Sequence, residues 1–358
     1  MDRLFSSIFG KKRPIRMETL MKSGLRRTFT HSFPTLLPAA ALLLASVTLL
    51  TTPALAQAPT YPNRAITLIV PFPPGGLADI VARPVSEALS RELGQPVVIE
   101  NKGGAGGGIG VGVAARAKPD GHTLLMALSS LTVLPEADAL LGRSPMFGLN
   151  DLRPIARYTA DPTVLAVRAD APWKTAKEFL EDARKRPSVI NYGSSGNYGT
   201  MHVPMEILAQ TAGVKMTHVP FTGAGPAVLA LLGGQIDAVS TGPATVLQQV
   251  KAGKLRVLAH WGHAPLASMP EVASLKDLGY NAEYAQWSGL FIPSGTPEAI
   301  AQRIRAAARV AAQDPKVREV IQNTGSPVVY LDSPDFEKYV QSDARNMTDV
   351  VRKIGKVE

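Results

Sequence analysis

The chain has 358 residues, a formal net charge of +9 and no cysteine, so disulfides, cysteine–metal sites and thiol catalysis are excluded. Residues 1–56 hold eight of the 38 basic residues and two of the 29 acidic ones, which leaves a net charge of +3 for residues 57–358. An excess this small, with no run of interleaved arginine and aromatic residues, argues against nucleic acid as a partner.

The first predicted element is an export signal. Arg26 and Arg27 precede an apolar run over 36–50, which is followed by a small-residue cleavage motif ending at Ala56. We therefore predict a signal peptide over residues 1–56. The alternative, a retained membrane anchor, is disfavoured because the apolar run is short for a membrane span. The export route (general secretory or twin-arginine) and the start codon stay open.

After the signal, strand-like and helix-like segments alternate, which indicates an α/β fold. The predicted strands are 66–70, 96–100, 123–127, 155–158, 164–168, 215–219, 236–240, 255–260 and 287–292. The predicted helices are 80–91, 111–117, 175–185, 202–211, 227–232, 244–252, 297–313, 315–324 and 334–354. The length after residue 56 suits two domains of ordinary size.

Four of the predicted helices begin after loops of small residues. These loops are Gly75–Gly76, Ser194–Thr200 (within a loop predicted over 191–200), Thr222–Pro226 and Thr241–Pro243. A helix N-terminus offers unpaired N–H groups to an anion, and glycine lets a carboxylate approach the backbone closely. Loops at the carboxyl ends of strands in an open α/β sheet face one crevice. Each loop alone could be an ordinary connection between a strand and a helix, but together they predict a cleft that holds a small carboxylated molecule.

Asp79 has two interpretations, because it lies in or just before the first turn of the helix over 80–91. It can cap the helix and complement its dipole. Alternatively, it can orient the glycine loop or accept from an ammonium or hydroxyl group of a ligand. A direct contact with a ligand carboxylate would require one of the two to be protonated. We interpret His202, after the serine loop, as a capping or packing residue.

Motifs of catalysis and metal binding are missing from the sequence. The glycine run 103–110 does not complete G-x-G-x-x-G, and the segment 193–197 does not complete G-x-S-x-G because its last position is Asn197. The five histidines after residue 56 lack metal-ligand spacing on one helix face. We therefore predict a protein that is not an enzyme, with no catalytic residue, metal site or cofactor.

With these loops located, the chain resembles the extracytoplasmic solute receptors of tripartite tricarboxylate transporters, also called Bug-type receptors. The resemblance covers essentially all of residues 57–358, in order. It rests on the segments 67–79 (TLIVPFPPGGLAD), 93–101 (LGQPVVIEN), 104–107 (GAGG), 119–125 (PDGHTLL), 191–197 (NYGSSGN), 218–221 (HVPF), 225–226 (GP), 232–237 (LGGQID), 251–256 (KAGKLR) and 287–291 (WSGLF).

The resemblance implies a two-domain periplasmic binding protein of type II, whose chain crosses twice between domains that close over a ligand. Domain 1 would comprise residues 57–160 and 265–358, and domain 2 residues 161–264. The implied protein is a monomer in the periplasm that delivers a small organic acid to a tripartite tricarboxylate-type permease. The ligand-binding residues that it implies are Gly75, Gly76, Asp79, Ser129, Ser130, Ser194, Ser195, Asn197, Thr200, Thr222 and Gly223.

Three features depart from the family pattern. Tyr198 stands where the family usually has glycine, Thr222 where relatives often have a basic residue, and the segment 136–150 is unusual. We expect Tyr198, a further candidate ligand contact, either to stack on an aromatic acid or to point to solvent. Dicarboxylates, tricarboxylates, acidic amino acids and aromatic acids all remain possible ligands. The alternative functions are a periplasmic sensor that signals to a partner and, less favoured, a hydrolase or transferase.

Overall fold

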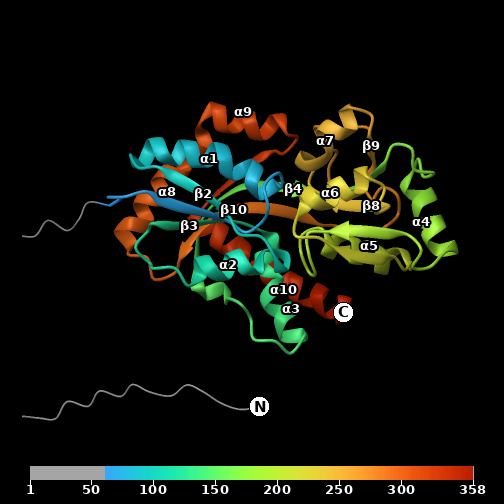
Figure 1. The fold of residues 1–358 in the computed structure, drawn as a ribbon, viewed down its shortest axis with the longest axis horizontal. Coiled ribbons are helices and arrows are strands. Elements are labelled where there is room, and N and C mark those ends of the chain that lie inside the picture. Colours follow the sequence, from blue (N-terminus) through green and yellow to red (C-terminus); the bar gives the residue numbers. More distant parts are fainter. Residues whose placement is uncertain (1–60, 358) are drawn as a thin grey trace, which may run out of the picture. The chain divides into compact units, whose positions relative to one another are not determined.

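Two β-sheets, each forming one lobe, organise residues 61–357, the part of the chain that the computed structural model describes (Figure 1). The signal peptide predicted over 1–56 lies outside the described residues. Residues 61–357 belong to one compact unit. Within residues 61–357, no helix combines the length and the apolar character that a membrane span requires.

The first lobe contains a six-stranded mixed sheet. Its strand order is β11 (Val328–Asp332), β4 (Leu152–Pro162), β10 (Ala285–Pro293), β3 (Thr123–Leu128), β1 (Ile66–Val70) and β2 (Val97–Asn101). The strands β1, β2 and β3 are parallel, whereas β10 runs antiparallel to both β3 and β4. The carboxyl ends of β1 and β3 therefore lie at one edge, as the prediction of a shared crevice requires.

Helices cover both faces of this sheet (Figure 1). One layer consists of α1 (Leu77–Leu93), α8 (Glu298–Gln313) and α9 (Pro315–Asn323), and the other of α2 (Gly108–Ala115), α3 (Leu134–Leu140) and α10 (Ser333–Ile354). Alternate residues of β1 point into the two layers: Leu68 belongs to the core under α1, and Ile69 to the core on the side of α2. Burial on both faces explains the uninterrupted apolar run of this strand.

The second lobe contains a five-stranded sheet in the order β7 (Thr217–Pro220), β6 (Asn191–Ser194), β8 (Ala238–Thr241), β5 (Val164–Arg168) and β9 (Leu255–His260). Its helices are α4 (Ala176–Lys185), α5 (His202–Ala212), α6 (Ala224–Leu232) and α7 (Pro243–Lys251). The chain crosses from the first sheet to the second between β4 and β5 and returns between β9 and β10. The two predicted crossings are confirmed, and with them the α/β fold of a two-lobed binding protein.

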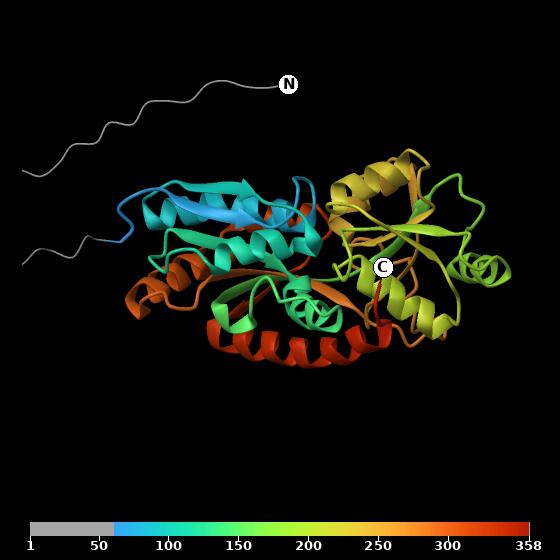
Figure 2. The ribbon, with the colours of Figure 1, turned by 60° about the horizontal axis from the view of Figure 1, so that its bottom comes forward.

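Besides the two chain crossings, the lobes are connected by the long helix α10, which packs against both of them. It lies along the first lobe and its C-terminal end reaches the second (red in Figure 2). There the Nε2 group of Gln210 on α5 donates to the carbonyl of Lys353 at 3.1 Å.

Several element predictions were wrong in detail. Residues 191–194 form the strand β6 rather than a loop, because backbone pairing with β7 and β8 on both sides outweighs the turn preference of Asn and Gly. The helix α3 and the strand β11 were not predicted. The strand β4 is longer than the predicted 155–158, since β10 and β11 pair with it on either side.

Candidate functional site

The glycine loop before α1 is held by a buried carboxylate. The backbone of Gly75 has a φ of +87°, a conformation that favours glycine, and Gly76 is the N-cap of α1 with no side-chain cap. The Asp79 carboxylate accepts from the backbone N–H of Gly75 (3.1 Å), from Arg83 Nε (2.9 Å) and from Asn101 Nδ2 (3.1 Å). Asp79 therefore orients the loop, while the first N–H groups of α1 are left without a side-chain cap.

The serine loop of the second lobe is held by two histidines. The Ser194 hydroxyl lies 2.6 Å from Nε2 of His218 and accepts from the N–H of Gly196 at 3.0 Å. The N–H of Tyr198 donates to Nδ1 of His202 at 3.0 Å. This contact supports the loop and does not cap α5, whose N-cap, Met201, has no side-chain cap; the buried His202 ring fits the packing role that was the other expectation.

The two imidazoles stack on each other, with ring centroids 4.1 Å apart. Burial lowers the pKa of His202 to about 3, with a further contribution from His218, and lowers the pKa of His218 to about 4. Both rings are therefore neutral at physiological pH. They act as rigid hydrogen-bonding supports of the serine loop and add no charge to it.

Tyr198 fastens the serine loop to the C-terminal segment. Its side chain is 1% exposed, its hydroxyl donates to the carbonyl of Gly355 (2.7 Å), and it accepts from the N–H of Val357 (3.1 Å). The expectation that Tyr198 points to solvent is therefore wrong. Tyr198 has a φ of +56°, in the left-handed region that glycine adopts most easily. This backbone conformation agrees with the glycine that usually stands at this position in the family that the sequence resembles.

A narrow cavity of about 10 Å³ lies between the glycine loop and the serine loop. It is lined by Phe72, Gly76, Leu77, Leu128, Ser195, Thr200, Met201, Ala224, Thr241 and Gln286. Two of its polar atoms, the Ser195 hydroxyl oxygen and the Gln286 amide nitrogen Nε2, are buried without a hydrogen-bond partner. Such atoms are costly unless a ligand or a water satisfies them.

The lobes touch around this cavity. A Cβ atom on Gly196 would lie 2.7 Å from the backbone nitrogen of Gly106, and a Cβ atom on Gly223 would lie 2.6 Å from Cδ of Pro73. The lobes are therefore closed, and the remaining space is about that of a single water molecule. A ligand of several heavy atoms can enter only if the lobes move apart.

The structure brings several predicted site residues together. Gly76, Ser195 and Thr200 line the cavity, and Gly75 and Asp79 support its first-lobe wall. No charged side chain is part of the lining. A bound anion would therefore be stabilised by helix N-termini and by uncharged donors.

Other predicted residues lie next to the cavity or away from it. The Asn197 amide oxygen is buried without a partner in the serine loop. Ser194, at the start of this loop, is engaged by His218. Thr222 is exposed, just before Gly223, the N-cap of α6. Ser129 and Ser130 are buried outside the lining, and the Ser129 hydroxyl lies 3.1 Å from the hydroxyl of Tyr284.

Gln286 is a candidate site residue that the sequence did not predict. It lies on β10 opposite Asp161 of β4, at the crossing between lobes. A Cβ atom on Gly242 would lie 2.1 Å from Gln286 Nε2, so the glycine leaves room for the amide. A single glutamine beside Trp287 has no local signal of function, and only the strand pairing places it at the cleft.

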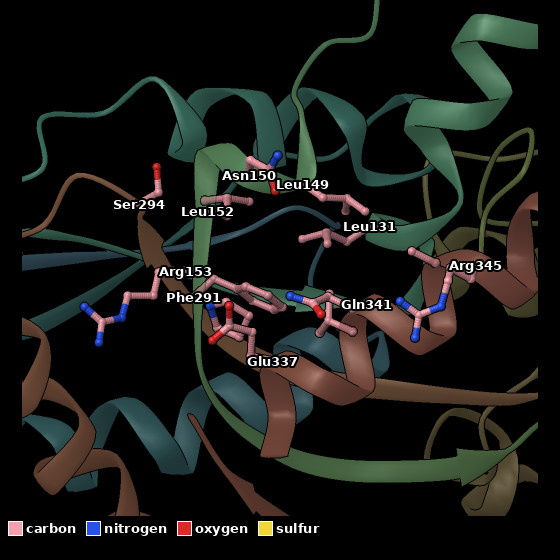
Figure 3. A pocket seen from close by; sticks show the side chains of 13 residues that line it. Leu131, Leu149, Asn150, Leu152, Arg153, Phe291, Ser294, Glu337, Gln341 and Arg345 are labelled. Atoms are coloured by element: carbon pink, nitrogen blue, oxygen red, sulfur yellow. The ribbon is translucent and has the colours of Figure 1, made fainter. Parts of the chain in front are cut away.

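Larger cavities occur elsewhere in the described residues. One of about 580 Å³ has an apolar floor that includes Leu131 and Phe291, and the exposed side chains of Glu337 and Arg345 lie at its edge (Figure 3). None of the predicted site residues lines it. Residues 61–357 contain no group of three or more side chains that could hold a metal ion. The interlobe cavity is the candidate site because the predicted loops and the unpartnered polar atoms meet there.

Comparison with known proteins agrees with this geometry. A family model described as the tripartite tricarboxylate transporter family receptor matches residues 81–356. Protein BugT of Bordetella pertussis is 31% identical to this chain, over 84% of this chain and 92% of the length of BugT. A solved periplasmic transporter is 38% identical, with a TM-score of 0.78, over 82% of this chain and 98% of its own. MatC of Rhodopseudomonas palustris, solved with bound malate, is 29% identical, with a TM-score of 0.75, over 81% of this chain and 100% of its own.

Proposed function

Because the chain belongs to the tripartite tricarboxylate transporter receptor family, we propose that it captures a small carboxylated organic acid between its lobes and delivers it to a tripartite permease. Receptors of this family are periplasmic solute-binding proteins and not enzymes. They bind small carboxylates and work with tripartite transporters. The malate bound to MatC supports an organic acid as the ligand of this chain. In this proposal the protein is exported to the periplasm, its signal peptide is cleaved near Ala56, and it acts as a monomer.

The observation that carries the proposal is the pair of unpartnered donors in the interlobe cavity. The Ser195 hydroxyl comes from the second lobe and the Gln286 amide from a crossing strand, and both lie in a cavity that also contains Gly76 at the N-terminus of α1. A hydroxyl and an amide can both donate to carboxylate oxygens. Hydrogen bonds to an ionised acceptor are stronger than neutral ones and suit a site without a cationic side chain.

Four further predicted residues receive roles in this proposal. Gly75 and Asp79 fix the glycine loop, and Ser194 fixes the serine loop through its bond to His218. Asn197 offers an amide to the same ligand once the lobes open. The proposed domains are residues 57–160 with 265–358, and residues 161–264.

The test is isothermal titration calorimetry with malate, citrate, glutamate and benzoate. We expect one acid class to bind the purified protein. Ser195→Ala and Gln286→Met should each weaken that binding by about 1.5–3 kcal/mol, or roughly 10–150-fold, because each removes a hydrogen bond to a charged group. Thr211→Ala, which removes an exposed hydroxyl on α5, is the matched control and should bind as the unmodified protein does.

Two results would contradict the proposal. One is a folded protein that binds no carboxylate. The other is an unchanged affinity in both cavity variants, which would move the ligand away from the interlobe cavity.

A further inference from the structure

The C-terminal segment, residues 355–357, follows α10 and contacts the serine loop of the second lobe. The hydroxyl of Tyr198 lies between two backbone groups of this segment. It donates to the carbonyl of Gly355 at 2.7 Å and accepts from the N–H of Val357 at 3.1 Å. Because both partners are backbone groups, the contact depends on where the segment lies and not on its side chains.

The C-terminal segment is attached to the first lobe through α10. In the middle of this helix, the Asp343 carboxylate accepts from the hydroxyl of Thr132 at 2.6 Å. In its last turn, Arg352 Nε pairs with the carboxylate of Glu136 on α3 at 2.9 Å. Both partners belong to the first lobe, so the hydrogen bonds between the segment and the serine loop join the two lobes.

These hydrogen bonds lie beside a contact that separates when the lobes open. Gly196, two residues before Tyr198, is where the backbones of the two lobes meet, since a Cβ atom there would lie 2.7 Å from the nitrogen of Gly106. A Cβ atom on Gly106 would in turn lie 3.0 Å from the carbonyl oxygen of Asn197. Because a ligand enters only when these loops part, the serine loop has to leave the C-terminal segment in the same motion.

The backbone of Tyr198 agrees with a role for its side chain. Its φ of +56° is strained for any residue except glycine, so a tyrosine persists there only where other contacts hold it. The contacts that hold it are the two hydrogen bonds to the C-terminal segment and the edge-on packing of its ring against His202, with ring centroids 5.7 Å apart.

We propose that the C-terminal segment is a latch, which stabilises the closed form of the protein by holding the hydroxyl of Tyr198. The close approaches at glycine limit how far the lobes can close, whereas the two hydrogen bonds of Tyr198 favour closure itself. Tyr198 is then a positioning residue that the ligand does not touch. The inference rests on the proposed function in one respect, that opening of the lobes admits and releases the carboxylate. A bound acid leaves only after the segment has released Tyr198.

The test measures the ratio of closed to open molecules in the purified protein with no acid added. The chain has no cysteine, so Ile109→Cys on α2 and Lys215→Cys in the second lobe provide the two attachment sites for spin labels. Both side chains are exposed and lie outside the lining of the interlobe cavity. Pulsed electron paramagnetic resonance gives the distribution of distances between the labels. We expect a closed component, at the separation of these positions in the structure, and a separate open component.

Two changes, made separately and together, examine the latch. Tyr198→Phe removes the hydroxyl and keeps the ring, and we expect the closed-to-open ratio to fall at least threefold, because the closed form alone loses two hydrogen bonds. Shortening the chain after Ile354 removes the segment and should lower the ratio at least as much. In the shortened chain, Tyr198→Phe should have no further effect, since the partners of the hydroxyl are already gone.

Tyr158→Phe is the matched control. The Tyr158 hydroxyl is also buried and also donates to a backbone carbonyl, that of Ala308 at 3.2 Å, but both residues belong to the first lobe. The closed-to-open ratio should therefore stay unchanged. If the shortened chain does not fold, Val357→Pro takes its place, because proline keeps the chain length and removes the N–H from which Tyr198 accepts. That variant should lower the ratio at least twofold.

The latch is refuted if the labelled protein with no other change has no closed component, or if Tyr198→Phe leaves the ratio as it was. It is also refuted if Tyr198→Phe lowers the ratio equally in the shortened chain, or if Tyr158→Phe lowers it as much as Tyr198→Phe does. No acid takes part in these measurements. The latch can therefore fail while a carboxylate binds, and a protein that binds no carboxylate can still show the latch.

Discussion

At the residue scale, the buried groups of this protein differ in how they are satisfied. Asp79 is buried and receives donors from the backbone, from Arg83 and from Asn101. Asp161 is buried, and no donor meets its carboxyl oxygens in good hydrogen-bond geometry; only the Ser326 and Thr159 hydroxyls lower its pKa against the larger effect of burial. The same side chain is thus a structural support with three kinds of donor in one place and a poorly satisfied acid in another, and burial together with the number and geometry of the donors decides between these roles.

The raised pKa of the buried Asp161 leads us to predict that the stability of the protein depends on pH. Its pKa is about 7 when folded and near 3.8 when unfolded, so between these values the folded protein keeps a proton that the unfolded chain has lost. The contribution of this group to stability therefore falls as pH rises from about 4 to about 7, by a few kcal/mol. The gain in unfolding free energy from Asp161→Asn should grow over that range and then level off.

Urea unfolding of both proteins at pH 4.5, 6 and 8 measures this difference. Other titrating groups are common to both proteins and cancel in the comparison. A difference that stays constant with pH would contradict an isolated acid at position 161.

The stacked histidines predict the opposite trend. An unfolded histidine gains a proton as pH falls through about 6.5, whereas His202 and His218 remain neutral down to about pH 3 and 4. Their contribution to stability is complete above pH 6.5 and decreases as pH falls below it. His202→Asn keeps an acceptor for the Tyr198 N–H and should lose part of this acid sensitivity. Unfolding free energies at pH 7, 6 and 5 test this, and parallel curves for the two proteins would refute it.

At the element scale, we propose that the N-terminus of α1 offers its uncapped N–H groups to the ligand. Gly76 has a φ of −89° and a ψ of 170°, which other residues adopt easily, and a Cβ atom there would lie 3.7 Å from Ala224. Its backbone does not require glycine. The missing side chain at Gly76 therefore leaves room between the lobes.

We predict that Gly76→Val lowers carboxylate affinity by more than about 100-fold, because the added methyl groups occupy a cavity of about 10 Å³. The unfolding free energy should change by about 1 kcal/mol or less, since the backbone accepts valine. Gly148→Val is the control, because Gly148 is an N-cap of similar backbone conformation (φ −100°, ψ 154°) outside the cavity lining. Calorimetry and urea unfolding give both quantities, and normal affinity in Gly76→Val would exclude a ligand at this helix end.

At the scale of the whole molecule, closure depends on close approaches at glycine. Gly223 begins α6 in the second lobe and faces Pro73 of the first, where a Cβ atom would lie 2.6 Å from a rigid ring atom. Gly233, at the other end of the same helix, would place a Cβ atom in ordinary contact, 3.4 Å from the carbonyl of Leu229.

Gly223→Ala should therefore hinder closure, whereas Gly233→Ala should not. We expect a carboxylate affinity at least tenfold lower in the first variant. Its radius of gyration in small-angle X-ray scattering should no longer decrease when ligand is added. Equal compaction of both variants would show that the contact with Pro73 does not limit closure.

The sequence by itself determined the features that depend on neighbouring residues. Apolar runs and periodicity located most strands and helices, and the glycine and serine loops were recognised because turn residues act locally. The cleft formed by those loops followed from a general rule about the carboxyl ends of strands.

Only the tertiary structure decided the features that join distant segments. The pairing of β10 with β4 places Gln286 in the cleft opposite Asp161, and the C-terminal segment removes Tyr198 from solvent. The strand β6 exists because two neighbours pair with it, against its own turn-forming composition. The physical reason is the same in each case, because burial and backbone pairing between segments far apart in the chain leave no pattern in the local sequence.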